Sequence, residues 1–188
     1  MSDPVTILDF WLGEIGPDGW YVASDALDAK IALEFGDLWQ AAFEGGLDHW
    51  VDGPAGSLAF LLLTDQFSRN MFRGQAKAFA TDPAALTAAH KAIAQGWDME
   101  VPEPERQFFY LPFEHSEDPA DQALGLGYIS ERMSNESTAL HARAHQEIIR
   151  RFGRFPFRNA ALGRDSTAQE QTFLQEGGYG AVLRALQS

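Results

Sequence analysis

The 188-residue sequence contains no cysteine. This absence excludes disulfide bonds, thiolate zinc sites and cysteine nucleophiles together. Basic residues are also scarce, with 14 Lys and Arg against 27 Asp and Glu, so the formal net charge is −13. So negative a chain repels phosphate groups, and we expect neither nucleic acid nor an anionic membrane as a partner.

Long apolar segments are absent as well. The longest apolar run, residues 58–63, is far shorter than a membrane-spanning helix. The first residues, MSDPVTILDFW, carry an acid where a secretory signal would carry Lys or Arg. These features predict a soluble, cytoplasmic protein.

Strand patterns are missing, and the spacing of apolar residues is helical. β-branched residues are few, and no segment alternates strictly between apolar and polar positions. Apolar residues instead recur every three or four positions, as at Leu140, Ala144 and Ile148. Three Asp-Pro pairs mark helix starts, because Asp caps free N–H groups and Pro fits the first turn. We expect helices near residues 4–12, 24–44, 57–72, 83–95, 103–111, 119–133, 136–152, 168–176 and 180–187.

Short helices with short connections pack as antiparallel neighbours. The sequence therefore predicts an all-α fold of stacked antiparallel helical hairpins, tetratricopeptide-like, in a single domain spanning residues 1–188. No linker or low-complexity segment divides the chain. The loop at 96–104 is the best candidate for a break between two subassemblies.

A polar ladder follows the most apolar run of the sequence. Asp65, Arg69 and Arg73 are spaced four apart, so they would share one face of a helix. Such a ladder is often a set of solvated ion pairs. On a core helix, however, it must face other polar groups or a cavity, so these three residues are predicted ligand-binding residues.

A second polar cluster follows Pro112, which should end or kink the preceding helix. Glu114, His115 and Glu117 would then lie on a turn. They could simply favour the start of the next helix, or form a carboxylate–imidazole cluster suited to proton transfer.

His141 and His145 are four residues apart on one predicted helical face. Such a pair can bind a metal, but it lacks the glutamate that makes the HExxH motif specific. We therefore expect no metal and no other cofactor. We include His145 with the cluster above as a candidate catalytic residue.

Positive charge gathers in RRFGRFPFRNAALGR, residues 150–164, which holds five of the arginines. Gly153 should end the preceding helix and Pro156 should prevent its resumption, so this stretch is predicted to be an ordered loop. Guanidinium groups suit carboxylates and phosphates. Arg154, Arg158 and Asn159 are thus predicted ligand-binding residues. Alternatively, the arginines of this loop tie it to Glu114, Glu117 and the helix of Asp65.

Four segments resemble, in order, the blocks of a bacterial family known as a domain of unknown function, number nine-two-four. They are ILDFWLG, DQFSRNMFRGQAKAFATDPAAL, FFYLPFEHSED and IIRRFGRFPFRNAALGRDSTAQEQTFL. The resemblance implies an all-helical, tetratricopeptide-like fold and supplies no activity. The sequence departs from the family pattern at Ser68, where proline is more usual, and at Phe157, where histidine is more usual.

We expect a cleft that binds an anionic small molecule or a peptide carboxylate, with Arg69, Arg154 and Arg158 as its clamp. One alternative is a hydrolase in which a Glu–His pair activates water, with or without a metal. The other is a non-enzymatic scaffold that holds a peptide in an apolar groove. Whether the protein is an enzyme, what its ligand is and how it oligomerises are not decided by the sequence.

Overall fold

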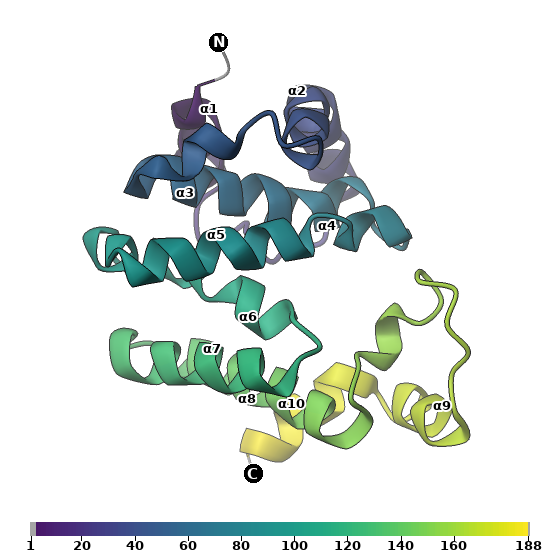
Figure 1. The fold of residues 1–188 in the computed structure, drawn as a ribbon. Helices are drawn as coiled ribbons and strands as arrows, with labels where there is room; N and C mark the ends of the chain where they lie inside the picture. The colour runs from purple at the N-terminus through teal and green to yellow at the C-terminus, as the bar shows by residue number, and fades with distance from the viewer. Residues whose placement is uncertain (1–2, 188) are drawn as a thin grey trace. The chain divides into compact units, whose positions relative to one another are not determined.

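The structure is a computed structural model and describes residues 3–187. These residues form helices and turns without any strand, which confirms the predicted all-α class (Figure 1). The helices are short, and several of them join 3-10 or π-helical turns directly. The α-helices are α1 (Pro4–Leu8), α2 (Asp25–Phe43), α3 (Pro54–Leu61), α4 (Ser68–Met71), α5 (Asp82–Ala94), α6 (Leu111–His115), α7 (Pro119–Arg132), α8 (Glu136–Phe152), α9 (Ala168–Gln175) and α10 (Gly178–Gln187).

The predicted helix ends agree well with these bounds where capping signals are strong. The carboxylate of Asp118 accepts a hydrogen bond from the N–H of Ala120 at the start of α7. Thr167 and Glu170 form a reciprocal capping box at the start of α9. Gly153 ends α8 in the left-handed conformation, with φ of 67°.

Two predicted helices are divided by π-helical segments. Residues Asp9–Ile15 continue α1 as a π-helix, and Leu62–Phe67 separate α3 from α4 in the same way. The two segments span only seven and six residues, too few for a change in the apolar period to show in the sequence. π-helical turns are rare and are often found at functional sites.

The prediction of a single helix at residues 103–111 is wrong. A 3-10 turn over Glu105–Phe109 is followed by α6, so Pro112 lies in the first turn of α6. Proline is tolerated there because the first N–H groups of a helix have no intrahelical acceptor. Glu114 and His115 therefore lie on a helix and not on the predicted turn, whereas Glu117 does precede α7 in the connection.

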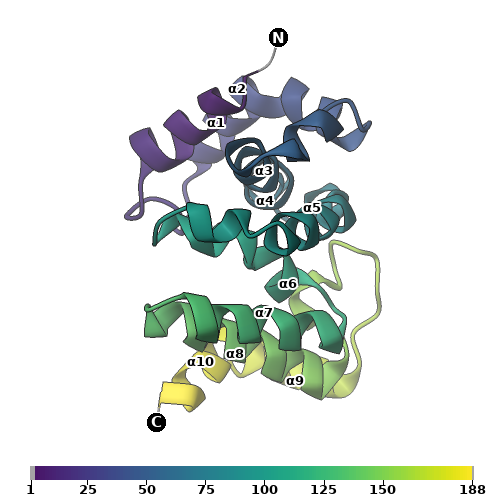
Figure 2. The same cartoon turned by 60° about the vertical axis from the view of Figure 1, so that its left-hand side comes forward.

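The chain separates into two compact units, Met1–Pro112 and Phe113–Ser188. The boundary follows the predicted break at 96–104 by several residues. In the first unit, α3 packs against α1 and α5, and α2 packs against α4 (Figure 2). Its core is aromatic: the rings of Phe10, Phe35 and Phe67 contact one another with centroids 5.1–5.9 Å apart.

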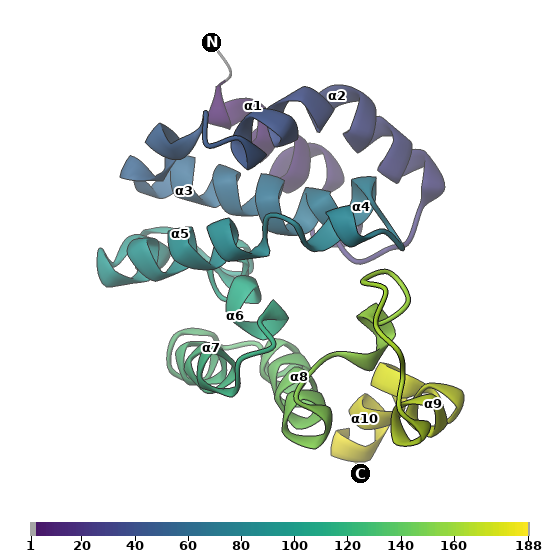
Figure 3. The same ribbon diagram turned by 45° about the vertical axis from the view of Figure 1, so that its right-hand side comes forward.

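In the second unit, α8 packs between α7 and α10, and α9 contacts α10 (Figure 3). Its core is formed by Ala144, Ile148, Ile149, Phe155, Phe173 and Val182. Phe155 is fully buried, so the arginine-rich segment after α8 is fixed to this core through its own aromatic side chain. No helix of the described part is long and apolar enough to cross a membrane.

Candidate functional site

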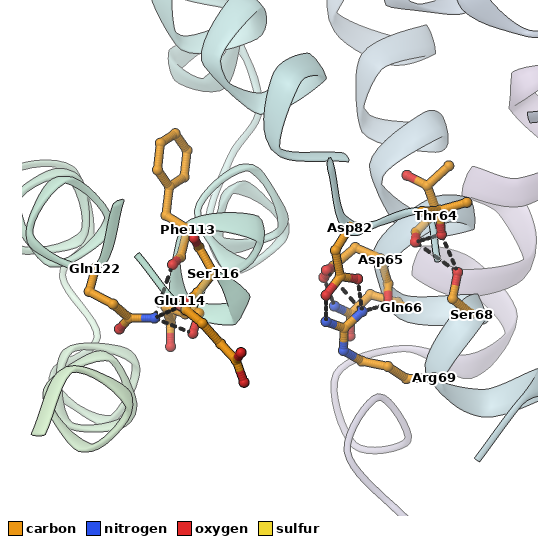
Figure 4. A network of polar contacts seen from close by, with 12 residues as sticks. Thr64, Asp65, Gln66, Ser68, Arg69, Asp82, Phe113, Glu114, Ser116 and Gln122 are labelled. Atoms are coloured by element: carbon orange, nitrogen blue, oxygen red, sulfur yellow. Dashed lines mark hydrogen bonds and ion pairs between the residues drawn. The ribbon is translucent and has the colours of Figure 1, made fainter. Parts of the chain in front are cut away.

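The polar ladder of the first unit is a buried ion-pair network. Asp65 lies in the π-helical segment, is 1% exposed and accepts a hydrogen bond from the Gln66 amide at 2.6 Å. The Arg69 guanidinium lies 3.1 Å from the Asp65 carboxylate and donates to both Asp82 oxygens, each at 3.1 Å (Figure 4). Arg69 is thus held by two acids.

Asp82 departs from its predicted role. Its sequence, Asp-Pro, indicated a helix cap, but Asp82 is the first residue of α5 and the cap position is Thr81. Its carboxylate accepts two hydrogen bonds from the Arg69 guanidinium.

Arg73 does not extend the ladder. Helix α4 ends at Met71, so the four-residue spacing no longer places Arg73 above Arg69. The Arg73 guanidinium donates to both carboxylate oxygens of Asp28 on α2, at 2.9 and 3.1 Å, and its side chain is 55% exposed.

The turn after α6 in the second unit is fixed by one amide. Gln122 on α7 directs Nε2 at the carbonyl oxygens of Glu114 and Ser116, at 2.6 and 2.7 Å, and at that of Phe113, at 3.2 Å (Figure 4). Gln122 is 2% exposed. The two short contacts account for the two N–H groups of the amide, while Gln122 Oε1 is buried without a hydrogen-bond partner among residues 3–187. The backbone that carries Glu114 is therefore held from α7.

Glu114 and His145 form a carboxylate–imidazole pair. Glu114 Oε2 lies 3.1 Å from His145 Nδ1, with the carboxylate side chain 2% exposed and the imidazole 16% exposed. Glu114 Oε1 is buried and has no hydrogen-bond partner among residues 3–187. The ring of His115 lies edge-on to that of His145, with centroids 5.9 Å apart. Three of the predicted catalytic residues are thus brought together.

Tyr179 joins this pair to His141. Its ring centroid lies 4.9 Å from that of His145, and its hydroxyl lies 2.6 Å from His141 Nδ1. Burial, assisted by the negative charge of Glu114, raises the pKa of Tyr179. Burial also lowers the pKa of His141; Glu114 opposes this effect and a charged His145 adds to it. Both shifts keep the proton on the Tyr179 hydroxyl, which donates to a neutral His141.

The fourth predicted catalytic residue, Glu117, has a different role. Its carboxylate accepts two hydrogen bonds from Arg164, at 2.7 and 3.0 Å, and one from the N–H of Phe155 at 2.8 Å. Burial raises the pKa of Glu117, but these hydrogen bonds outweigh it and hold the pKa below its usual value. Glu117 ties the arginine-rich segment to the unit.

Arg154 is tied in the same manner. Its guanidinium donates to both oxygens of the buried Glu170, at 2.6 and 2.8 Å, and to the carbonyl oxygen of Asp165. The contact with Arg154 lowers the pKa of Glu170 to about 2, against the effect of burial and with the help of Thr167. Arg154 is thus bound to acidic and carbonyl groups of its own unit, and its role in ligand binding stays a prediction.

Arg158 and Asn159 are both buried. The guanidinium carbon of Arg158 lies 4.5 Å from the centre of the Phe155 ring, and its charge helps to lower the pKa of Glu117. Asn159 donates to Ser166 Oγ and accepts from Arg164, both at 3.0 Å. Asn159 therefore supports the loop. The predicted clamp combines Arg69 of the first unit with Arg154 and Arg158 of the second, and it stays a prediction.

Sequence reasoning missed Tyr179, Gln122, Asp82 and Glu170. Tyr179 precedes the helix predicted at 180–187, yet α10 begins at Gly178. The other three contact residues six to sixteen positions away, which is beyond the spacing of one helical turn, and nothing in a single sequence pairs them. Among residues 3–187, no group of three or more His, Asp or Glu side chains is arranged to hold a metal ion.

Comparison with known proteins identifies the family. Residues 7–178 match the family described as bacterial protein of unknown function (DUF924), so the chain belongs to this family, as its sequence blocks predicted. A solved structure, described as a protein of unknown function, ATU0120, from Agrobacterium tumefaciens, is 43% identical. The match covers 93% of this chain and 97% of that one, with a TM-score of 0.88. No curated protein matches the chain.

Proposed function

We propose that the second unit carries a general acid–base site that hydrolyses a small molecule, with Glu114 and His145 at its centre. The main support for this proposal is the Glu114–His145 pair, in which a buried carboxylate orients a partly exposed imidazole. An ionised carboxylate can only accept a hydrogen bond, so His145 Nδ1 donates and the neutral ring has its basic lone pair on Nε2. Nε2 has no hydrogen-bond partner in the described part of the chain.

His145 Nε2 would remove a proton from water as the water oxygen adds to the carbonyl carbon of the substrate. The same proton would then pass to the departing alcohol or amine as its bond to that carbon breaks. The products are a carboxylic acid and the released alcohol or amine, so the atoms of one water molecule are accounted for. Glu114 would stabilise the imidazolium that forms between these steps.

The anion clamp predicted from the sequence is a weaker proposal. An anion bound by Arg69 or Arg154 would have to displace Asp65 and Asp82, or Glu170, from short and well-formed contacts. Exchange of one carboxylate for another gains little free energy, because the guanidinium is already paired.

An open groove of about 220 Å³ beside α8, α9 and α10 favours the scaffold alternative. Phe173, Val182 and Leu186 supply its apolar surface, while Glu147, Arg151 and Glu176 contribute charge. Peptide-binding grooves of stacked helical hairpins have this mixture of apolar and charged surface. The second candidate function is therefore that of a tetratricopeptide-like scaffold that binds a peptide without catalysis.

The acid–base proposal is tested with a panel of p-nitrophenyl esters and amino-acid p-nitroanilides. His145→Gln should lower kcat/KM by about 10²–10⁴-fold, the usual contribution of a general base. Glu114→Gln should also impair turnover, because the neutral amide carries no charge to stabilise the imidazolium and can turn its NH2 group, a donor, toward Nδ1.

The exposed His49 of the first unit provides the matched control, since His49→Gln removes an imidazole outside the site. Both site variants should retain the helical circular dichroism spectrum. Undiminished turnover in folded His145→Gln would overturn the proposal, as would the absence of turnover across the panel.

A further inference from the structure

One oxygen of the buried Glu114 carboxylate accepts no hydrogen bond from the described residues. One oxygen contacts His145, while Oε1 is buried without a hydrogen-bond partner. Buried polar atoms are nearly always paired, since an unpaired one loses its hydration without compensation. A hydrogen-bond donor supplied by a ligand would therefore be favoured at this atom.

Three arginine side chains of this unit contact groups other than Glu114. Arg154 binds Glu170, and Arg164 binds Glu117. The guanidinium of Arg158 lies over Phe155. An anionic ligand at Glu114 Oε1 would meet a carboxylate that offers no proton, whereas a cationic donor would form a charge-assisted hydrogen bond.

A row of aromatic rings leads outward from His145. The centroid distances are 4.9 Å from His145 to Tyr179, 5.6 Å from His145 to Phe155 and 5.2 Å from Phe155 to Phe157. Phe157 is 44% exposed. Aromatic faces attract cations, and this row already holds one in Arg158, 4.5 Å from the Phe155 ring centre.

We infer that the ligand of this site carries a protonated amine beside a flat apolar group. The amine donates to Glu114 Oε1, and the apolar group lies near the ring of Tyr179. This inference rests on the proposed function, because it places the ligand at the Glu114–His145 pair and defines the substrates as cationic esters or amides.

Binding is measured with benzylamine, benzyl alcohol and sodium benzoate, three probes of similar size and different charge. Calorimetry and thermal shift at neutral pH should detect benzylamine and give at least about tenfold weaker binding for benzoate, a difference of about 1.4 kcal/mol. Glu114→Gln should weaken benzylamine binding by a similar factor. Glu131→Gln, an exposed position on α7, is the matched control because it removes the same charge elsewhere in the unit.

Equal or stronger binding of benzoate would overturn the inference, and so would benzylamine binding that survives in Glu114→Gln. No response to benzylamine at millimolar concentration would overturn it as well. Benzylamine binding without hydrolysis of any substrate would contradict the acid–base proposal alone. Turnover confined to neutral or anionic substrates would contradict the ligand class alone.

Discussion

Phe157 stands at the outer end of the aromatic row that leads to His145. Its ring stacks on Phe155 at an interplanar angle of 28° and is 44% exposed. The sequence resemblance gives histidine as the more usual residue at this position. A second imidazole here would stand one ring away from the Glu114–His145 pair.

We predict that Phe157→His raises hydrolytic turnover if the family chemistry uses that imidazole. The substitution should change stability little, because the position is partly exposed and histidine can also stack on Phe155. The measurement is kcat/KM on the p-nitrophenyl and p-nitroanilide panel, with Phe157→Leu as the control that removes the ring. Equal turnover in the parent and Phe157→His would show that position 157 serves packing alone.

The contacts among the candidate site residues were only partly predictable from the sequence. The cluster at 114–117 and the spacing of His141 and His145 identified Glu114, His115 and His145 correctly as neighbours. A tie between the loop arginines and Glu117 was one of two alternatives, and the sequence could not choose between them because the partner, Arg164, lies 47 residues away. Local spacing predicts which side chains share one helix face, but it carries no information on contacts between distant segments.

At the scale of the element, Gln122 is the link between α7 and the turn that carries Glu114. Its amide bonds the carbonyl oxygens of Glu114 and Ser116, which the short helix α6 leaves without intrahelical donors. Six of the predicted helices, which correspond to α2, α5, α7, α8, α9 and α10, begin and end within two residues of the bounds in the structure. Four of them, α2, α7, α8 and α9, begin at a residue whose side chain caps the helix. The π-helical turns and the 3-10 turn before α6 were missed because they span only five to seven residues, too few for a change in apolar period to show in the sequence.

We predict that Gln122→Leu loosens the Glu114–His145 contact and destabilises the protein by about 1–3 kcal/mol, the usual cost of unpaired buried polar groups. The specific measurement is the ring ¹⁵N chemical shifts of His145. In the parent these should report the proton on Nδ1, and in Gln122→Leu a larger share should move to Nε2.

The matched control is Gln171→Leu, which removes another amide donor to a backbone carbonyl, that of Ser166, in the same unit. It should leave the His145 shifts unchanged. If Gln122→Leu destabilises the protein yet the His145 tautomer is unaltered, Gln122 supports the fold without positioning the site.

At the scale of the whole molecule, the excess of acidic residues explains why arginines of the stretch at 150–164 form ion pairs. Arg150, Arg154 and Arg164 each bind a carboxylate, of Glu147, Glu170 and Glu117 respectively. In a chain with a net charge of −13, such pairs reduce local repulsion between acids. The positive charges of these three residues are therefore each paired with a carboxylate of the same unit.

The pairing of Glu170 predicts a specific dependence of stability on pH. Its pKa is about 2 in the folded protein, below the ordinary 4.5, so the unfolded chain takes up this proton first as the pH falls. The stabilisation by Glu170 is thus fully present above pH 4.5 and is lost as the pH falls from there toward about 2.

Thermal unfolding at a series of pH values should show Glu170→Gln with a lower Tm than the parent near neutral pH. Each kcal/mol lost corresponds to about 2–4 °C in a chain of this size. The gap between the two proteins should narrow steadily in the acid range. Glu176→Gln, an exposed position after α9, should show no such gap at either end of the series. A constant difference between Glu170→Gln and the parent at all pH values would mean that the charge of Glu170 does not stabilise the fold.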